Sequence, residues 1–414
     1  MMTPPDRHVT GGVDTHGDVH VAAALDSATG RHLGTASFPT TTDGYVALAE
    51  WLRGLGHLDW VGVESTGSYG AGLMRFLRAE GVEVIEVDRP DRKARRFEGK
   101  SDPADAQAAA RAVLSGRARS TPKSRDGIVE AIRALEVVHH SAVKDRTRAI
   151  NQFKALLVSA PESVRDGLHG LRFTDQIARA RRWSDGHGND VERETRWSLK
   201  ELARRIGFQD DQTARLEARI GALAAQASPA LMGLSGVGPH VAAQLLAAAG
   251  DNPQRMRSEA AFAKLCGACP IPASSGKTNR HRLNRGGDRR ANNALFTIVL
   301  VRMRHDPATR AYVARRTAEG KTPKEIMRCL KRFVAREVYQ AITSPPEDLP
   351  TGGELRQLRL GLSLSLTAVC NAVGTTPTRL SGIERGQVHD TRLARRARTW
   401  LLERTDNAEC QAAA

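Results

Sequence analysis

The stretch VTGGVDTHGDVHVAAAL, residues 9–25, decides the fold of the first part of this chain. Its two apolar runs, VTGGVDT (9–15) and DVHVAAAL (18–25), are short and separated by a polar break, a pattern typical of β-strands. Asp14 stands at the end of the first run. The sequence therefore predicts two adjacent strands in the chain with a carboxylate at the end of the first.

Working outward, apolar strand-like runs alternate with amphipathic segments. We predict a strand over 31–38, a helix over 43–55, a buried strand over 60–65 (WVGVES), a helix over 68–80, a strand over 82–88 and an alanine-rich helix from Ser101. Asp102 suits the N-cap of that last helix, and Pro103 suits its first turn. This order predicts an α/β layer fold with a mixed sheet.

The rest of the chain is mostly helical and is expected to divide into further segments. Residues 126–226 are highly charged and lack clean heptads, so a coiled-coil arm is only one interpretation. We expect a first domain over 8–118, a helical connector over 119–228, a helical domain over 229–340, a linker over 341–353 and a small helical module over 354–405.

The charge balance predicts a polyanionic partner. Among 414 residues, 62 Lys and Arg face 46 Asp and Glu, which gives a formal net charge of +16. Counterion release favours binding of such a protein to nucleic acid. Aromatic residues make up 4%, too few for base stacking to dominate, so we expect arginine–phosphate contacts. Scattered cysteines, no signal peptide and no membrane-spanning stretch favour a cytoplasmic, nucleoid-associated protein without a membrane partner.

Four carboxylates are placed where a metal site could form. Asp14 and Glu64 end predicted strands, and Asp102 and Asp105 share one face at the start of a helix. Converging carboxylates repel one another unless cations lie between them, and two Mg²⁺ ions can clamp the attacking and leaving oxygens of a phosphodiester. Asp102 as a simple helix cap and Asp14 as a turn residue are the alternatives. Competing acids lie nearby: Asp18, Glu83, Glu86 and Asp88.

Two glycines and a basic loop in the second half could bind phosphate. Gly236 and Gly238, in LSGVGPHVAAQLLAAAGD (234–251), form a glycine hairpin before a helix whose N–H groups could hold a phosphate. This hairpin resembles a helix-hairpin-helix DNA-binding element, and an ordinary helix entry is the alternative. The loop within 266–295 carries several cations: Lys277, Arg280, Arg282, Arg285, Arg289 and Arg290. It also contains Ser274 and Ser275 before Gly276, a sequence that more often forms a turn than a nucleophile.

Cys266 and Cys269 form a C-x-x-C pair in the same loop. A zinc site would need two more ligands, and His281 is the only close candidate, so packing of small residues in a turn is favoured.

The C-terminal stretch predicts a helix-turn-helix of the phage-repressor type. Its first helix would span LTAVCNAVG (366–374), and TPTRLSGIERG (376–386) would enter the major groove. The residues nearest to bases or phosphates would be Thr376, Thr378, Arg379 and Ser381. A helical bundle that binds protein is the alternative.

Three motifs, GVDTHGDVHVAA (12–23), VGVESTGSYG (61–70) and KSDPADA (100–106), resemble the DEDD transposases of the insertion-sequence one-ten family, which includes the pilin-gene inverting recombinases. The stretch 132–157 is similar to that family's helical connector, and the resemblance covers roughly residues 8–340. It implies a nuclease domain of the RuvC or ribonuclease-H type with Asp14, Glu64, Asp102 and Asp105 as its acids.

The same resemblance implies further properties. A serine before a glycine, Ser275 with Ser274 as near rival, would form a phosphoserine bond to DNA. A structured guide RNA made from the element would pair with target and donor DNA, and dimers would assemble into a tetramer. Asp288 departs from the family pattern, which often has Asn after the glycine.

Two other functions are compatible with the same sequence. One is a junction-resolving nuclease in which water attacks and no covalent adduct forms. The other is a DNA-binding regulator without enzymatic activity, which the intact acidic set disfavours. Loss of an adduct in Ser275→Ala would separate the recombinase from the nuclease.

Overall fold

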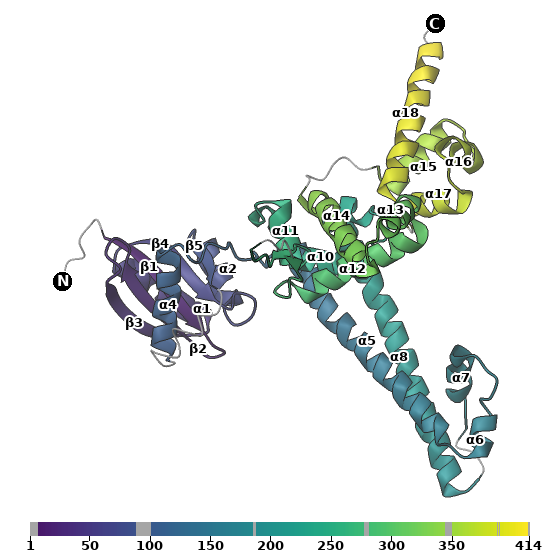
Figure 1. Cartoon of the computed structure of the whole chain (residues 1–414), viewed down its shortest axis with the longest axis horizontal. Helices are drawn as coiled ribbons and strands as arrows, with labels where there is room; N and C mark the ends of the chain where they lie inside the picture. Colours follow the sequence, from purple (N-terminus) through teal and green to yellow (C-terminus); the bar gives the residue numbers. More distant parts are fainter. Residues whose placement is uncertain are drawn as a thin grey trace. The chain divides into compact units, whose positions relative to one another are not determined.

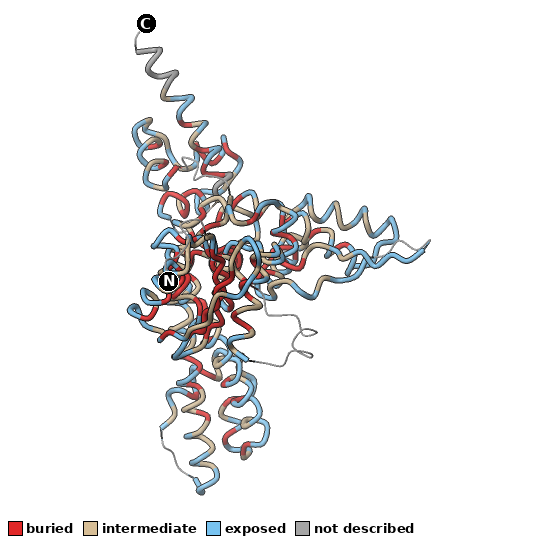
Figure 2. Tube along the Cα trace, turned by 90° about the vertical axis from the view of Figure 1, so that its left-hand side faces the viewer, coloured by how far each residue is buried: buried red, intermediate tan, exposed pale blue. Residues whose placement is uncertain are grey.

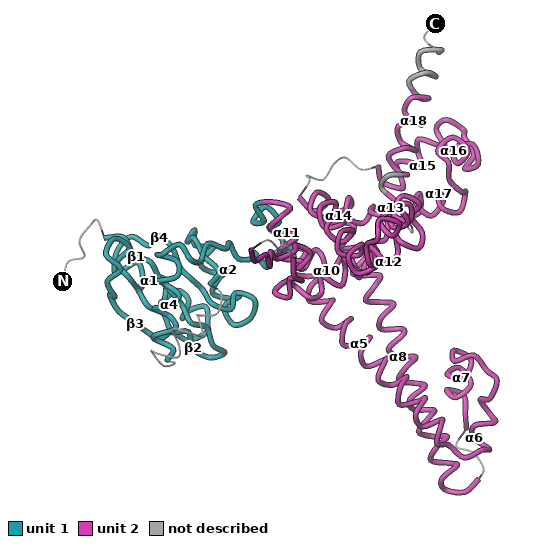
Figure 3. The backbone as a smooth tube through the Cα atoms, in the orientation of Figure 1, with its two compact units in different colours: residues 1–127, 249–257 teal, residues 128–248, 258–414 magenta. Residues whose placement is uncertain are grey.

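The computed structural model describes residues 7–87, 101–184, 188–276, 281–343, 350–386, 388 and 390–412, the last range without the side chains of 391, 392 and 406–412. The chain forms two compact units (Figure 3): residues 1–127 with 249–257, and residues 128–248 with 258–414. The short segment 249–257 thus belongs to the first unit, which the sequence did not indicate.

Unit 1 is built on a five-stranded mixed sheet with the order β3-β2-β1-β4-β5 (Figure 1). The strands are β1 (His8–Thr15), β2 (Val19–Asp26), β3 (His32–Pro39), β4 (His57–Glu64) and β5 (Glu83–Val87). β2 is antiparallel to β1 and to β3, whereas β4 is parallel to β1 and to β5. All five predicted strands are present, and the mixed sheet with its helices is consistent with a ribonuclease-H-like layout.

Helices cover both faces of this sheet. On one face, α1 (Thr42–Gly54) and α2 (Ala71–Ala79) contribute Leu48 and Leu73 to the core that contains Val13 and Val63. On the other, α4 (Asp102–Leu114) packs through alanines, with Ala106 against β2 and Ala109 against β5. Figure 2 shows the resulting concentration of buried residues along the strands. α2 begins at Ala71 rather than 68, because turns occupy the residues after Glu64.

Asn252 links the segment 249–257 to the rest of unit 1 by two hydrogen bonds. The side-chain amide of Asn252 donates to the Pro122 carbonyl at 3.0 Å, and its oxygen accepts from the Ser124 N–H at 3.1 Å. Asn252 is buried, so these bonds satisfy polar groups that water cannot reach.

Unit 2 begins with two long helices, α5 (Ile128–Val158) and α8 (Asp190–Ala227), which lie side by side (Figure 1). The short helices α6 (Glu162–Asp166) and α7 (Phe173–Ala180) pack with them in one apolar cluster that includes Phe153, Val164, Ile177 and Leu199. The predicted helical region is therefore a packed helix pair with its own small core.

Shorter helices follow the helix pair in unit 2. They are α9 (Pro229–Met232), α10 (Pro239–Ala249), α11 (Glu259–Leu265), α12 (Arg289–His305), α13 (Pro307–Ala318) and α14 (Pro323–Thr343). Two strands of two residues each, β6 (Ile271–Pro272) and β7 (His281–Arg282), pair antiparallel in the basic loop. The sequence did not predict them.

Both α14, which extends to Thr343, and the next helix, which begins at Gly352, enter the range 341–353 that was predicted as a linker, and residues 344–349 lie outside the described part of the chain. Four helices follow: α15 (Gly352–Gly361), α16 (Leu366–Val373), α17 (Pro377–Glu384) and α18 (Thr391–Ala412). They share an apolar cluster that includes Leu355, Val369, Leu380 and Leu401. Two helices thus lie where the sequence predicted them, with Gly374 in the left-handed conformation (φ 63°) between them. None of the helices in the described ranges is long and apolar enough to cross a bilayer.

Candidate functional site

The sheet register places Asp14 and Glu64 on neighbouring strands. β1 and β4 are parallel, and Val13 pairs with Val63, so Asp14 and Glu64 are the next residue of each strand. Residues paired in this way point to the same face of a sheet. The Thr15 hydroxyl also donates to the Glu64 carbonyl at 3.1 Å. Both residues are buried: Asp14 is 8% exposed and Glu64 is 6% exposed.

Close contact between α4 and the sheet directs the other two acids to the same place. Gly12 and Gly62 lie two residues before Asp14 and Glu64, on the same face, and a Cβ on Gly12 would meet the Ala106 carbonyl oxygen at 2.3 Å. α4 therefore covers this face, and its first turn carries Asp102 and Asp105. Ser101, not Asp102, is at the N-cap, so Asp102 is not explained by capping.

The charges of the first turn act on Asp14. Burial raises the pKa of the Asp14 carboxyl above its ordinary value, His16 beside it lowers that pKa, and the charges of Asp105 and Asp102 raise it again. Carboxylates that disfavour one another's ionisation in this way are suited to share a cation.

His16 completes the cluster, and the sequence interpretation missed it. Its Nε2 lies 3.1 Å from Asp14 Oδ2 and 3.5 Å from Asp102 Oδ1, and ligand atoms of these three residues lie within 4.8 Å of one another. The signal that could have identified it is its position two residues after Asp14, at the end of β1. The acidic cluster is defined below as Asp14, Glu64, Asp102 and Asp105, with His16 at its edge.

The competing acids are placed differently. Glu86 pairs with Val63 in the register, on the opposite face from Glu64, and accepts from the Thr66 hydroxyl at 2.5 Å. Glu83 begins β5 at the other end of the sheet and accepts from the Trp60 indole at 3.1 Å. Asp18 is exposed in the turn before β2. Asp88 lies outside the described residues.

In unit 2, the glycine hairpin leads into α10. Gly236 has φ 83°, a left-handed conformation, and a Cβ there would approach the Ile298 carbonyl oxygen at 3.2 Å. Arg302 Nε donates to the Ser235 carbonyl at 2.8 Å, so α12 holds the hairpin in place. Gly238 has open space around it.

The basic loop exposes both candidate serines. Ser274 and Ser275 are exposed before Gly276, which has φ 55°, and the exposed Arg282 and Arg285 follow in the same loop. Lys277 and Arg280 lie outside the described residues. Beside the loop is a cavity of about 660 Å³ whose lining is rich in cations: Arg282, Arg316, Lys321, Arg328, Lys331 and Arg332. This surface of unit 2 is suited to a polyanion.

Asp288 caps a helix, and the two cysteines do not form a metal site with His281. Asp288 is the N-cap of α12 and accepts from the N–H groups of Arg290 and Ala291 at 2.8 and 2.9 Å. Burial raises the pKa of the Cys266 thiol to about 12, which disfavours the thiolate that zinc requires. Among the described residues, no candidate metal cluster contains Cys266, Cys269 or His281.

Near the C-terminus, the helix α17 presents polar side chains. Thr376 caps it by accepting from the Arg379 N–H, Thr378 is exposed, and Ser381 is half-buried. The Arg379 guanidinium lies 2.6 Å from the Asp390 carboxylate. Arg379 is thus engaged within the module in the absence of any ligand.

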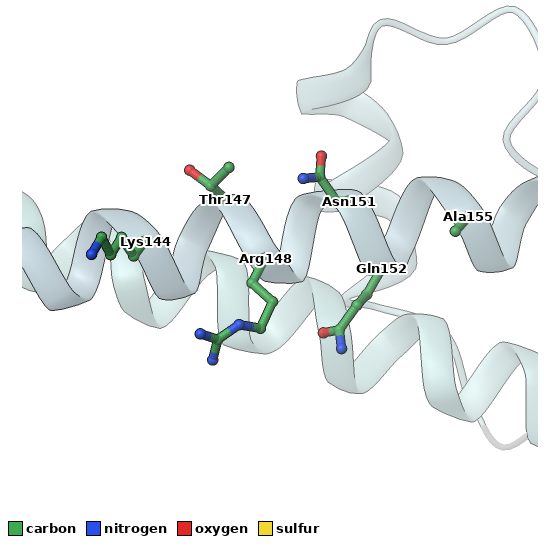
Figure 4. A pocket seen from close by; sticks show the side chains of 6 residues that line it. All are labelled: Lys144, Thr147, Arg148, Asn151, Gln152 and Ala155. Carbon is green, nitrogen blue, oxygen red and sulfur yellow. The ribbon is translucent and has the colours of Figure 1, made fainter.

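A polar row follows one exposed face of α5 (Figure 4). Its five polar members, together with Ala155, recur at helical spacing around a shallow hollow of about 550 Å³: Lys144, Thr147, Arg148, Asn151, Gln152 and Ala155. Such a face can contact a phosphate backbone without reading sequence.

Comparisons with known proteins show which family the chain resembles. Residues 11–160 match a family model described as "Transposase", and residues 228–314 match the model of the "Transposase IS116/IS110/IS902 family". The chain is similar to the insertion element IS110 uncharacterized 43.6 kDa protein of Streptomyces coelicolor, at 36% identity over 134 residues, 32% of this chain and 33% of that protein. It is also similar to the insertion element IS900 uncharacterized 42 kDa protein of Mycobacterium paratuberculosis, at 31% identity over 103 residues, 25% and 26% of the two chains. The matched segments thus span a third or less of these relatives.

Proposed function

Since the chain belongs to the IS116/IS110/IS902 family of transposases, whose two matched models cover more than half of its residues, we propose that it is a recombinase that cuts and rejoins DNA strands of an insertion element. The observation that carries this proposal is the convergence of strand ends and the α4 start in one acidic cluster. A DNA strand is the substrate that suits both this cluster and the excess of 62 basic over 46 acidic residues.

The acidic cluster fits divalent cations. Asp14, Glu64 and Asp105 are buried, Asp102 is half-exposed, and the charges of Asp102 and Asp105 disfavour ionisation of Asp14. Mg²⁺ prefers such carboxylate ligands, so Asp14, Glu64, Asp102 and Asp105 would hold two Mg²⁺ ions. Bound there, Mg²⁺ would stabilise the charge that develops on the phosphate oxygens. His16, which bridges Asp14 and Asp102, would orient both carboxylates.

Ser275 is the proposed nucleophile. Its Oγ would attack the phosphorus, the bond from phosphorus to a deoxyribose oxygen would break, and that oxygen would leave as a hydroxyl with the serine proton. A strand hydroxyl would then attack the phosphoserine, rejoin the DNA and restore the serine. Ser275 and the acidic cluster lie in different units, so the proposal requires both units to act on one phosphodiester, from one copy of the chain or from two.

The partners follow from this chemistry. Double-stranded DNA of the element ends and the target is the substrate, and strand exchange between four ends suits dimers that assemble into a tetramer. Phosphates would contact Gly236, Gly238, Arg282, Arg285 and the unplaced Lys277 and Arg280. Thr378 and Arg379 on α17 would read an element end or promoter as part of a helix-turn-helix. An element-encoded structured RNA would guide the pairing, and the polar row on α5 is suited to its backbone.

Adduct trapping tests the proposal. Full-length protein is incubated with Mg²⁺, labelled DNA carrying the element ends, and RNA transcribed from the flanking non-coding stretch, then denatured. We expect a covalent protein–DNA adduct with the unaltered chain and with the matched control Ser274→Ala, and its loss with Ser275→Ala. Strand cleavage that survives Ser275→Ala without an adduct would favour the nuclease in which water attacks. Activity that needs only the module after residue 350 would favour the regulator.

A further inference from the structure

A second cluster of ligand-type side chains lies in unit 2, whereas the acidic cluster belongs to unit 1. Glu136 and His139 come from one face of α5, and His240 comes from the second residue of α10. One ligand atom of each lies within 4.8 Å of the others, and the two imidazole ring centres are 4.8 Å apart. Glu136 and His139 are each 2% exposed, so this cluster is far better shielded than a surface ion pair.

The hydrogen bonds of the cluster do not satisfy its polar atoms. His139 Nε2 lies 3.3 Å from Glu217 Oε1 on α8, whereas His139 Nδ1 is buried and has no hydrogen-bond partner within the described part of the chain. His240 Nδ1 lies 2.9 Å from Glu136 Oε1, and its Nε2 lies 2.8 Å from the Gln244 amide nitrogen. In the same described ranges, the buried Gln244 Oε1 also has no partner.

No placement of protons on the side chains of this cluster gives every buried polar atom a partner among the residues that the structure describes. If the Gln244 amide turns its oxygen toward a protonated His240 Nε2, its Oε1 gains a partner. A neutral His240 then presents the lone pair of Nδ1 to the Glu136 carboxylate, which repels it. A doubly protonated His240 removes that repulsion but leaves His139 Nδ1 buried without a partner. A cation bound by Nδ1 of both histidines and by the Glu136 carboxylate satisfies every one of these atoms.

We propose that Glu136, His139 and His240 bind a dication of the zinc type, with solvent in a fourth position. Two imidazoles and a carboxylate are a ligand set that zinc accepts, whereas Mg²⁺ prefers oxygen ligands alone. Tetrahedral zinc holds its ligand atoms roughly 3.4 Å apart, so small side-chain rotations bring the present atoms into range. Glu217 and Gln244 would then bond the outer nitrogens of the two histidines, the arrangement that usually orients zinc-binding imidazoles.

The position of the site indicates its role. The ion would join α5 to α10 directly after the Gly236–Gly238 hairpin, so it would fix the orientation of this hairpin relative to α5. It would act as a structural ion and would hold whether or not Ser275 is the nucleophile.

Zinc counting tests the site. Untagged full-length protein is stripped with a chelator, loaded with excess Zn²⁺, desalted and analysed for bound metal. We expect His240→Gln and His139→Gln each to bind one equivalent less than the unaltered chain, while Cys269→Ser and His281→Gln lose none. Glu217→Gln should keep the ion but weaken its affinity by roughly 10–100-fold. Equal zinc in His240→Gln and the unaltered chain, or loss of the ion in Cys269→Ser, would overturn the proposal.

A measurement on the unaltered chain covers the case in which a variant does not fold. Zn²⁺ should protect the half-exposed His240 from acylation by diethyl pyrocarbonate, mapped by peptide mass spectrometry, while the exposed His32 stays reactive. Substitution with Co²⁺ should give the absorption of a tetrahedral nitrogen–oxygen site without thiolate charge transfer. Unchanged acylation of His240 with and without zinc would refute the site.

Discussion

The backbone nitrogen of Ala110 lies 2.2 Å from the point where a Cβ on Gly12 would stand. A glycine at position 12 therefore allows α4 to rest directly on β1, and this contact brings the first turn of α4 to the end of the strand where Asp14 lies.

Gly12→Ala should displace α4 from the sheet. Because the clash is with backbone and cannot be relieved by a rotamer change, we expect unit 1 to lose more than about 2 kcal/mol in urea denaturation, together with most strand cleavage. Gly54→Ala is the matched control, since a Cβ there meets nothing within 4 Å. A Gly12→Ala protein with unchanged stability and cleavage would show that α4 is not seated as described.

Asp14→Asn should stabilise unit 1 while abolishing its response to cations. Burial and the charges of Asp105 and Asp102 raise the pKa of Asp14, so its charged form costs stability at neutral pH when no cation is bound. We expect slower hydrogen exchange in β1 of the variant in EDTA. Mg²⁺ at 100 times its Kd should stabilise only the unaltered chain, by about 2.7 kcal/mol.

The control for this experiment is Glu83→Gln, which alters an exposed acid bonded to Trp60 at the other end of the sheet. It should keep both the Mg²⁺ response and strand cleavage, whereas Asp14→Asn should reduce cleavage at least about 100-fold. An Mg²⁺ response that persists in Asp14→Asn would remove Asp14 from the metal site.

Arg359→Ala should unfold the helices α15 to α17. Its guanidinium donates to both carboxylate oxygens of Glu384, at 2.7 and 2.8 Å, and both side chains are buried. Removing one partner of such a pair costs about 3–5 kcal/mol, while the double change Arg359→Met with Glu384→Leu should cost far less. Hydrogen exchange over α15–α17 measures the difference, with the exposed Arg385→Ala as a near-neutral control. If the single change Arg359→Ala and the double change gave equal hydrogen exchange, the buried Arg359–Glu384 pair would not stabilise these helices as proposed.

Arg285→Ala should make DNA binding less dependent on salt. If Arg285 neutralises a phosphate, the slope of log K against log salt should fall by about 1, with equal weakening for all DNA sequences. Arg172→Ala is the matched control, because Arg172 is an exposed arginine at the N-cap of α7, outside the basic loop, and it bonds Asp175. Anisotropy titrations of a labelled duplex give both slopes, and identical slopes would exclude a phosphate contact at Arg285.

The sequence alone determined the elements of unit 1 and made Asp14, Glu64, Asp102 and Asp105 candidate site acids. Strand-forming runs and the alanine-rich helix are local patterns, so β1 to β5 and α4 could be predicted within a few residues. The helices α16 and α17 were predicted for the same reason, because Ser365, Thr376 and Gly374 mark their ends.

Only the tertiary structure decided which acids meet and which unexpected residues join them. Glu83 and Glu86 have the same side chain as Glu64. The strand register and the packing of α4 against Gly12 and Gly62 place only Glu64 beside the acids of α4. The contact of His16 with two acids, the helix cap made by Asp288, and the cluster of Glu136, His139 and His240 likewise depend on residues distant in the chain. The periodicity of apolar residues indicates which face of a helix or strand is buried. The residues that pack against this face are decided by contacts between elements, and no local sequence pattern specifies those contacts.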